Sequence, residues 1–224
     1  RGVAGFKITT KELLYPIIGK SGKGSRFVDI DDNEYIDISM GFGALLFGHT
    51  PEFVQIAFQN QITSGVQLGP QAALTHEVAR LICEMTGVDK IAFCNTGTEA
   101  IMTAIRLARL KSNKQKIAMF SGAYHGFYDA TLGISINADI ANIHPLTEGL
   151  PDKIFQDLLI LEYNREEDIS KLKQYVNDLA CIIIEPVRGR FPGIQSKTFL
   201  ELVRTFADKN NIILIFDEVV TGFR

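Results

Sequence analysis

Residues 91–110 read Ile-Ala-Phe-Cys-Asn-Thr-Gly-Thr-Glu-Ala-Ile-Met-Thr-Ala-Ile-Arg-Leu-Ala-Arg-Leu, and this stretch decides the fold. Its first four residues are apolar and predict a buried strand. The next four, Asn95 to Thr98, form a short polar turn that contains Gly97. From Glu99 onward the apolar residues recur at helical spacing. The stretch therefore predicts a strand that leads through a tight glycine turn into a helix.

The turn at Thr96, Gly97 and Thr98 has two interpretations. The free N–H groups of a first helical turn, together with the helix dipole, favour a bound anion such as phosphate. Gly97 allows a close backbone approach, and the two threonine hydroxyls can add hydrogen bonds. In the alternative interpretation, Thr96 or Thr98 only caps the helix, and Glu99 adds charge to its first turn. The motif alone does not choose between a phosphate site and a helix cap.

Composition and charge exclude some classes of function. The chain has 224 residues, a net charge of −3 and 46% hydrophobic residues, which is enough for a substantial core. The slightly acidic balance, without a basic patch, argues against nucleic acid as a partner. No apolar run reaches the length of a membrane span, and the N-terminus lacks a secretory pattern. We therefore expect a cytoplasmic protein without a membrane partner.

The cysteines and histidines suggest neither disulfides nor a metal. The three cysteines lie in apolar surroundings and predict reduced, buried thiols: Cys83, Cys94 and Cys181. The four histidines have neither the spacing nor the clustering of a metal site, so we expect no metal.

The N-terminal segment, residues 1–50, predicts an arm followed by a hairpin that turns at residues 31–33. The glycine-rich run at 19–25 is not a nucleotide-binding loop, because it lacks the Gly-Lys-Ser/Thr ending and precedes a strand pattern. Helices are predicted over residues 51–64 and 74–86.

Residues 51–224 predict one large domain of alternating strands and helices. Short, apolar, mostly β-branched runs are typical of parallel strands covered on both faces, and they occur at 117–120, 158–163, 180–184 and 212–216. Helical patterns lie between them at 166–177 and 197–209. We predict a three-layer α/β domain with a mainly parallel sheet and right-handed crossovers.

The predicted strands end in residues that can bind a ligand. The strand at 117–120 leads to Tyr124 and His125, and the last two strands lead to Glu185 and Asp217. Taken singly, Tyr124 can be a surface aromatic residue, and either carboxylate can cap a helix or form a surface ion pair. Ligands of such folds gather at the strand ends, however, and these residues share that edge with the glycine turn. Together they favour a binding site.

The chemistry of this set describes pyridoxal 5'-phosphate. An anion site with an aromatic platform suits a flat, phosphorylated heterocycle. A carboxylate at a strand end suits a ring nitrogen that must stay protonated, and a protonated pyridine stabilises a neighbouring carbanion.

Four motifs, in order, resemble the class III aminotransferases, which are pyridoxal-phosphate enzymes of fold type I. They are Phe93-Cys-Asn-Thr-Gly-Thr-Glu-Ala100, Ala123-Tyr-His-Gly126, Ile184-Glu-Pro-Val187 and Phe216-Asp-Glu-Val-Val-Thr-Gly-Phe-Arg224. Residues 28–37 and 46–49 resemble the N-terminal segment of the same family. Within it the chain is similar to glutamate-1-semialdehyde aminotransferase. At 41–48 and 158–163 it resembles more strongly the aminotransferase domains of hybrid polyketide–nonribosomal peptide synthases of the mycosubtilin and iturin type.

The resemblance implies how the cofactor is held. The turn from Thr96 to Thr98 holds the phosphate. Tyr124 stacks on the pyridine ring, with His125 beside it.

The resemblance also implies the chemistry on the other side of the ring. Asp217 pairs with the protonated ring nitrogen, Val219 packs on the face opposite Tyr124, and Glu185 lies near the reacting amine. The residues expected to act in catalysis are thus Asp217, Glu185 and Tyr124.

The activity implied by the resemblance is transfer of an amine from a donor amino acid to a keto or aldehyde acceptor, by a homodimer. In the synthase-type relatives the acceptor is a β-keto acyl thioester on an acyl carrier protein. The alternatives are a free-standing enzyme like glutamate-1-semialdehyde aminomutase, and a non-catalytic domain that retained the fold. A Rossmann nucleotide domain is disfavoured, since no Gly-x-Gly-x-x-Gly follows a strand.

One departure from the family concerns the end of the sequence. The family's Schiff-base lysine and the C-terminal part of its small domain lie beyond the aspartate motif, whereas this sequence ends at Arg224. We therefore expect residues 1–224 to be a fragment, with a large domain incomplete at its C-terminus, that cannot transaminate alone.

Overall fold

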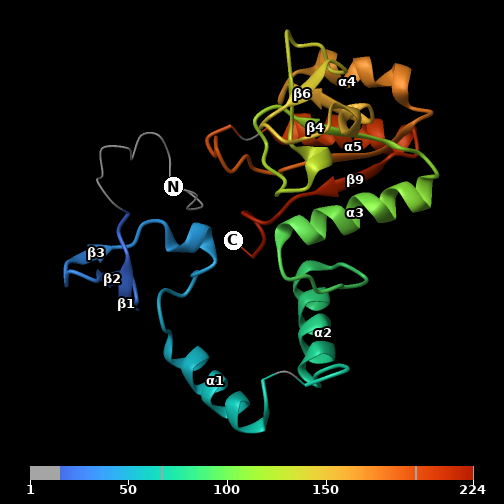
Figure 1. Cartoon of the computed structure of the whole chain (residues 1–224). Coiled ribbons are helices and arrows are strands. Elements are labelled where there is room, and N and C mark those ends of the chain that lie inside the picture. Colours follow the sequence, from blue (N-terminus) through green and yellow to red (C-terminus); the bar gives the residue numbers. More distant parts are fainter. Residues whose placement is uncertain (1–15, 67, 195, 224) are drawn as a thin grey trace. The chain divides into compact units, whose positions relative to one another are not determined.

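The computed structural model describes residues 16–66, 68–194 and 196–223. The chain divides into two units, residues 1–91 and 92–224, and Figure 1 labels many of their elements. Most of the expected N-terminal arm falls on residues 1–15, outside the described residues. The division into residues 1–50 and 51–224 stays a prediction.

The first unit begins with a three-stranded antiparallel sheet, in the order β1 (Gly19–Lys23), β2 (Arg26–Asp29) and β3 (Glu34–Ile36). The carboxylate of Asp29 accepts N–H bonds from Asp31 and Asn33, which closes the turn between the second and third strands. The hairpin predicted at this turn is confirmed. Two helices follow at the predicted places, α1 (Glu52–Ser64) and α2 (Leu74–Thr86).

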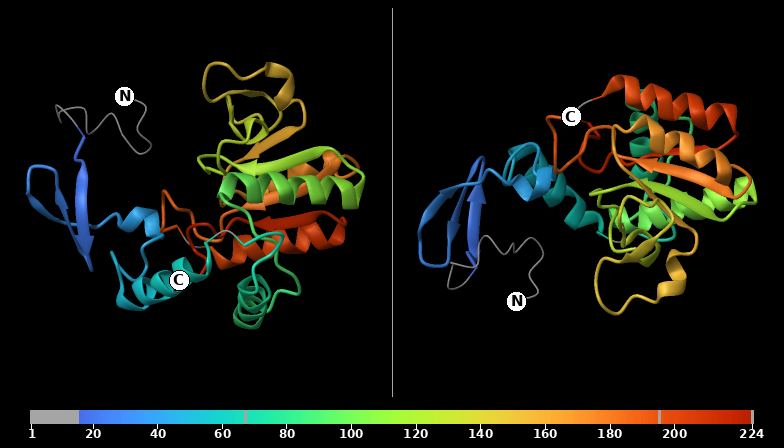
Figure 2. Two further views of the ribbon diagram at one scale, coloured as in Figure 1. Left: turned by 60° about the horizontal axis from the view of Figure 1, so that its bottom comes forward. Right: turned by 90° about the horizontal axis from the view of Figure 1, so that it is seen from above.

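The second unit is built on a sheet of four parallel strands (Figure 2). In sheet order they are β7 (Leu158–Leu161), β4 (Lys116–Phe120), β8 (Leu179–Ile184) and β9 (Ile213–Phe216). A separate antiparallel pair consists of β5 (Gly133–Ser135) and β6 (Ile143–Pro145). The mainly parallel sheet is therefore confirmed.

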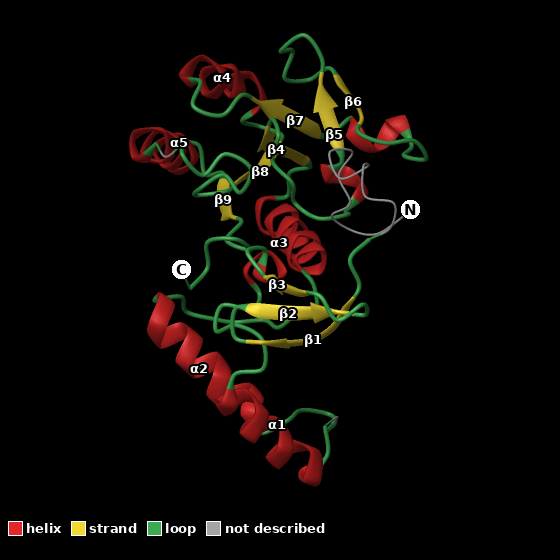
Figure 3. Ribbon diagram, turned by 90° about the vertical axis from the view of Figure 1, so that its left-hand side faces the viewer, coloured by secondary structure: helices red, strands yellow, loops and turns green. Residues whose placement is uncertain are grey.

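Helices cover both faces of this sheet. They are α3 (Gly97–Ser112), α4 (Glu166–Lys171) and α5 (Lys197–Lys209). Figure 3 shows α3 on one side of the strands and α4 and α5 on the other. Because successive side chains of a strand point to opposite faces, Ile117 and Met119 pack in the cluster with α3, whereas Ala118 and Phe120 pack with α4 and α5. The three-layer α/β architecture is confirmed.

Strand β8 is the most deeply buried strand of the sheet, with every residue from Leu179 to Ile184 at 0% exposure. Full burial of one Leu or Ile side chain contributes about 1.5–3 kcal/mol. The end of this strand, and Glu185 after it, are thus fixed by the core. Burial also raises the pKa of the Cys181 thiol to about 12, which keeps it protonated.

The predicted strand at 91–94 and the predicted burial of two cysteines are wrong. Residues 91–94 form no strand, and Phe93 is 53% exposed. Cys94 is exposed and Cys83 half-buried, so only Cys181 has the predicted burial. The physical reason is that an apolar run becomes a strand only where a neighbour takes up its N–H and C=O groups, and no described strand pairs with this one.

Two further observations concern the described residues only. Among them, no helix combines the length and hydropathy that crossing a bilayer requires. In the same part of the chain, no three His, Cys, Asp or Glu side chains gather closely enough to hold a metal ion.

Candidate active site

Three loops of the second unit lie at one edge of the parallel sheet. They follow the C-terminal ends of β4, β8 and β9 and begin at Ser121, Glu185 and Asp217. Parallel strands bring their C-terminal ends to the same edge, so the residues of these loops meet although they are far apart in sequence.

His125 and Asp217 form a buried hydrogen bond at this edge. The imidazole Nδ1 of His125 lies 2.6 Å from Asp217 Oδ2. His125 is 2% exposed and Asp217 is 8% exposed. An ionised carboxylate only accepts hydrogen bonds, so Nδ1 carries the hydrogen and donates it. The backbone N–H of Val219 donates to the other oxygen, Oδ1, at 3.1 Å.

Asp217 is held in its ionised form. Burial alone would raise the pKa of this carboxyl, but the hydrogen bonds from His125 and Val219 outweigh it and hold the pKa below its ordinary value of 3.8. A buried carboxylate at a strand end therefore keeps its negative charge.

The second ring nitrogen of His125 is unusual. Nε2 is buried and has no hydrogen-bond partner among the residues that the structure describes. Buried polar atoms are nearly always paired, so an unpaired one calls for an explanation, and a bound ligand is one such explanation.

The turn at the start of α3 combines both interpretations of its sequence. Thr96 is the helix cap, because its Oγ1 accepts the N–H of Glu99 at 3.2 Å. The Glu99 carboxylate in turn accepts the N–H of Asn95 at 2.7 Å. The N–H groups of Gly97 and Thr98 have no partner in the described part of the chain, so they stay available to an anion.

Thr98 is locked to the loop that follows β4. Its Oγ1 accepts the backbone N–H of Phe127 at 3.0 Å, and its hydroxyl hydrogen is left to donate elsewhere. Gly126 has φ +83°, and a Cβ there would lie 2.9 Å from Thr98 Cα and collide with Thr98 Oγ1. Only glycine fits this crossing.

Val219 comes close to the same turn. Its Cγ2 would lie 3.1 Å from a Cβ at Gly97, so the absence of a side chain at Gly97 admits the valine. Val219 is 64% exposed. Contacts thus run from Gly97 through Val219 and Asp217 to His125.

Tyr124 and Glu185 lie on the same loops but outside that chain of contacts. Tyr124 is 46% exposed and meets the ring of Phe127 edge to face at 5.8 Å. The Glu185 carboxylate accepts the N–H of Gly189 at 3.1 Å. In the described residues, neither Tyr124 nor Glu185 shares a hydrogen bond or ion pair with Asp217.

The resemblance implies a place for His125 beside the ring that Tyr124 stacks on, and this stays a prediction. What the structure adds is the hydrogen bond between this histidine and Asp217. The motif order could not show this, because the bond joins residues 92 positions apart. A buried histidine on one strand-end loop and a carboxylate on another is the signal that could have pointed to the pair.

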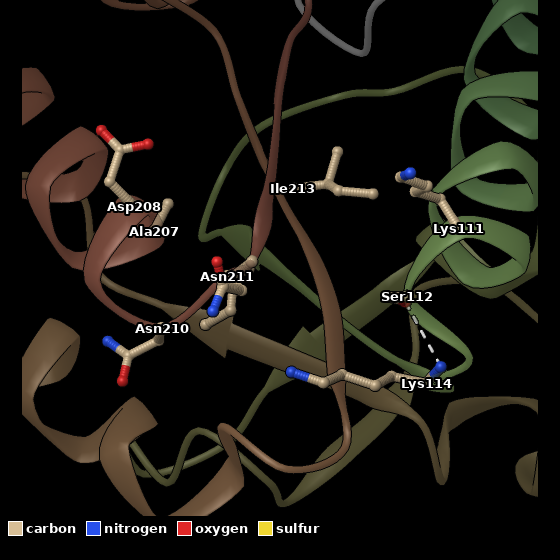
Figure 4. Close-up of a pocket in the computed structure, with 9 residues that line it drawn as sticks. Lys111, Ser112, Lys114, Ala207, Asp208, Asn210, Asn211 and Ile213 are labelled. Carbon is tan, nitrogen blue, oxygen red and sulfur yellow. Dashed lines mark hydrogen bonds between the residues drawn. The ribbon is translucent and has the colours of Figure 1, made fainter.

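A cavity of about 650 Å³ lies at the opposite edge of the sheet (Figure 4). It is lined by the C-terminal ends of α3 and α5 and the start of β9, and none of its lining residues belongs to the predicted site. The lining residues are Lys111, Ser112, Lys114, Ala207, Asp208, Asn210, Asn211, Ile212 and Ile213. This cavity therefore does not coincide with the predicted site.

Comparison with known proteins decides the family. The family model described as aminotransferase class-III matches residues 8–224, which is nearly the whole chain. The chain belongs to the class-III aminotransferase family. Class-III aminotransferases are pyridoxal-phosphate enzymes of transaminase type, in agreement with the cofactor expected from the sequence.

Curated relatives of this class-III chain include glutamate-1-semialdehyde 2,1-aminomutases. That of Caldicellulosiruptor saccharolyticus is 39% identical over 211 residues, which is 93% of this chain and 48% of the relative. That of Legionella pneumophila strain Corby is 41% identical over 212 residues, or 93% and 49%. The chain spans about half the length of the curated relatives it matches.

Solved structures agree. A transaminase with pyridoxal phosphate bound has a TM-score of 0.84 at 31% identity, over 92% of this chain and 49% of its own. An omega-transaminase from Sphaerobacter thermophilus has a TM-score of 0.86 at 28% identity, over 93% and 50%.

Proposed function

We propose that this chain is part of a pyridoxal-phosphate transaminase that moves an amine from a donor amino acid to a keto or aldehyde acceptor. The observation that carries the proposal is the buried pair of His125 and Asp217 at the strand edge, because it presents an ionised carboxylate where a protonated ring nitrogen needs one.

The residues present fit this cofactor in three respects. Two free N–H groups, at Gly97 and Thr98, begin a sixteen-residue helix and suit a phosphate. Val219 lies close to Gly97, which has no side chain, and so lies beside the proposed phosphate turn, where it can pack against a flat ring. The buried Nε2 of His125 has no described partner, and a bound ligand is one explanation for such an unpaired atom.

Bound pyridoxal phosphate supplies an electron sink that stabilises negative charge on the carbon next to the reacting amine. Asp217 keeps a proton on the ring nitrogen by charge pairing. His125 orients Asp217 through Nδ1 and holds it ionised. Tyr124 and Val219 bind the two ring faces, and Thr98 donates its hydroxyl hydrogen to the phosphate.

Glu185 is assigned to the side of the reacting amine. Its half-buried carboxyl group is oriented by the N–H of Gly189, and a carboxylate at this place can attract an ammonium group. This role rests on its place at the end of β8.

Spectroscopic titration of the full-length polypeptide with pyridoxal phosphate tests the proposal. We expect a saturable visible absorbance band that is lost on addition of a donor amino acid and restored by a keto acceptor. No band in a folded protein would support the alternative of a non-catalytic domain that retained the fold.

Two acceptor classes remain for the full-length protein. The names of the curated relatives support a semialdehyde-type substrate, converted by an aminomutase. Resemblance at residues 41–48 and 158–163 supports instead a β-keto acyl thioester on an acyl carrier protein, within a polyketide or nonribosomal peptide synthase of antibiotic biosynthesis. Mass spectrometry of a carrier-bound β-keto chain and of a free small aldehyde, each incubated with enzyme and donor, separates the two. Amination of the aldehyde alone supports the first.

We also propose that the protein is a homodimer. Helix α1 buries none of its residues in the described chain and exposes large apolar side chains: Phe53, Val54, Ile56, Phe58 and Ile62. Such a surface is typical of an interface. Light scattering of the full-length protein, with Phe58→Glu as the variant, tests this: we expect a dimer that the variant converts to monomer.

A further inference from the structure

Arg188, on the loop after β8, holds the start of the loop after β4. Its Nη2 donates to the backbone oxygen of Ser121 at 2.7 Å. The guanidinium lies over two aromatic rings, 5.2 Å from the centre of Tyr163 and 4.8 Å from that of Phe191. A planar guanidinium that contacts two rings and donates a charge-assisted hydrogen bond is restricted in its orientation.

The backbone under Arg188 is shaped to admit it. Gly122 has φ +75°, and a Cβ there would lie 2.8 Å from Nη2 of Arg188. The neighbouring Ser121 also donates its N–H to the oxygen of Leu161 on β7 at 2.7 Å. The guanidinium therefore packs directly on a backbone turn that is tied to the sheet on its other side.

Three side-chain contacts from distant segments hold the loop at 121–127. Arg188 binds its first residue, Asp217 binds His125 in its middle, and Thr98 binds the N–H of Phe127 at its end. Two of these anchors belong to the proposed cofactor site. Arg188 is the third, and neither motif nor family resemblance assigned it a role.

Tyr124 is the residue that depends most on these anchors. It is half exposed, and its one ring contact in the described residues is with Phe127, another member of the same loop. Among the described residues, no hydrogen bond, ion pair or aromatic pair joins its side chain to a residue outside the loop. Its orientation therefore follows the loop backbone.

We propose that Arg188 is a positioning residue that fixes the loop at 121–127 and thereby the orientation of Tyr124 toward the cofactor. The loop-fixing step stands on the contacts above, and the consequence for the cofactor rests on the proposed function. Arg188 acts through Ser121 and Gly122 and makes no contact of its own with the reacting atoms.

Hydrogen exchange of the cofactor-free full-length protein tests the loop-fixing step. Arg188→Met should speed exchange in a peptide covering 121–127 by about tenfold, as expected for local opening, and leave α5 unchanged. The control is Arg190→Met, an exposed arginine of the same loop without a hydrogen bond or ion pair in the described residues. Unchanged exchange at 121–127, or an equal rise in α5, would overturn the proposal.

Arg188→Lys keeps the charge and a hydrogen-bond donor but loses the planar stacking. The exchange rate of the 121–127 peptide in this variant should therefore lie between those of wild type and Arg188→Met. If Arg188→Met does not fold, this variant decides by the same peptide comparison: equal exchange to wild type overturns the proposal.

Visible circular dichroism of bound pyridoxal phosphate tests the consequence for Tyr124. At saturating cofactor, Arg188→Met should lose signal per bound cofactor, whereas Arg190→Met should not. Full signal with faster loop exchange would overturn the link to Tyr124. A wild-type protein that binds no cofactor would contradict the proposed function, while the exchange result still decides the role of Arg188.

Discussion

His125 Nδ1 donates a 2.6 Å hydrogen bond to Asp217 Oδ2 across the end of the sheet, and both side chains are buried. The pair joins the loop after β4 to the end of β9. Because both residues are buried, loss of either side chain leaves the other short of a hydrogen-bond partner, which makes the pair sensitive to pH and to substitution.

Acid should weaken the fold through Asp217. Its pKa in the folded protein is below the ordinary 3.8, whereas in the unfolded chain it returns to that value, so the carboxylate stabilises the fold above about pH 4. This stabilisation is lost as the pH falls through the lowered pKa. Urea unfolding at several pH values should show a steeper loss of stability below pH 4 in wild type than in Asp217→Asn.

Asp168 is a second buried carboxyl whose pKa is lowered, despite burial, by its bonds to Lys171 and the N–H of Glu162. Its contribution remains in the Asp217→Asn variant. Identical pH profiles for the two proteins would therefore contradict the assignment to Asp217.

Replacement of His125 by Phe should destabilise the protein by about 3–5 kcal/mol, because a buried charge loses its partner. The measurement is the free energy of unfolding in urea. In the background of Asp217→Asn the same replacement should reduce the stability clearly less, since the amide carries no charge that would remain buried without a partner. Equal costs in both backgrounds would mean that the two residues are not coupled.

Asp217→Asn should leave the fold largely intact and reduce the rate of each half-reaction by on the order of 100-fold or more, the scale of losing one fixed charge contact in an active site. Asn keeps an acceptor for the N–H of Val219 but carries no charge to hold a proton on the ring nitrogen. Single-turnover kinetics in the full-length enzyme is the measurement, and near-normal rates would remove Asp217 from this role.

Thr98→Val should raise the dissociation constant for pyridoxal phosphate about tenfold or more, as one charge-assisted hydrogen bond is worth ~1.5–3 kcal/mol. Thr98→Ser is the matched control, because it keeps the hydroxyl that binds the N–H of Phe127. Equilibrium titration measures the affinity. The melting temperature of the cofactor-free protein shows how much of the effect comes from loss of the hydrogen bond between Thr98 and the N–H of Phe127. Unchanged affinity in Thr98→Val would misplace the phosphate site.

Gly126→Ala should destabilise the protein more than Gly149→Ala. Both glycines have left-handed backbones, with φ +83° and +87°, so both variants carry strain of about 1–3 kcal/mol. Only at Gly126 does the new Cβ also collide with Thr98, whereas nothing lies within 4 Å at Gly149. The difference in the free energy of unfolding between the two variants, measured in urea, gives the cost of the collision with Thr98. Equal stabilities would show that the backbone at Gly126 and Thr98 can shift to accept a Cβ.

Much of the architecture could be predicted from local pattern. The apolar runs at 117–120 and 180–184 became parallel strands because helices cover both faces of the sheet. The run at 91–94 has the same character but no strand, since apolar composition says nothing of which partner takes up its backbone groups. Burial of Cys94 failed for the same reason.

The position of the strand-end residues could be predicted, but the contacts between them could not. Strand-end position brought His125 and Asp217 to one edge, but their hydrogen bond depends on the exact course of two loops. Arg188 was missed altogether, because a guanidinium that contacts two aromatic rings has no fixed sequence spacing. The roles of Tyr124, Glu185 and Val219 toward a cofactor stay predictions.

The strand order of the second unit bears on how the protein is made. Strand β9 is the last of the four to leave the ribosome, and it carries the carboxylate that His125 needs, 92 positions after the histidine. A nascent chain halted before β9 has the turn at 96–98 and the loop after β4 but lacks the carboxylate that pairs with the imidazole. Since contacts this distant in sequence form late, the loop after β4 gains its anchor at His125 only once translation has passed β9.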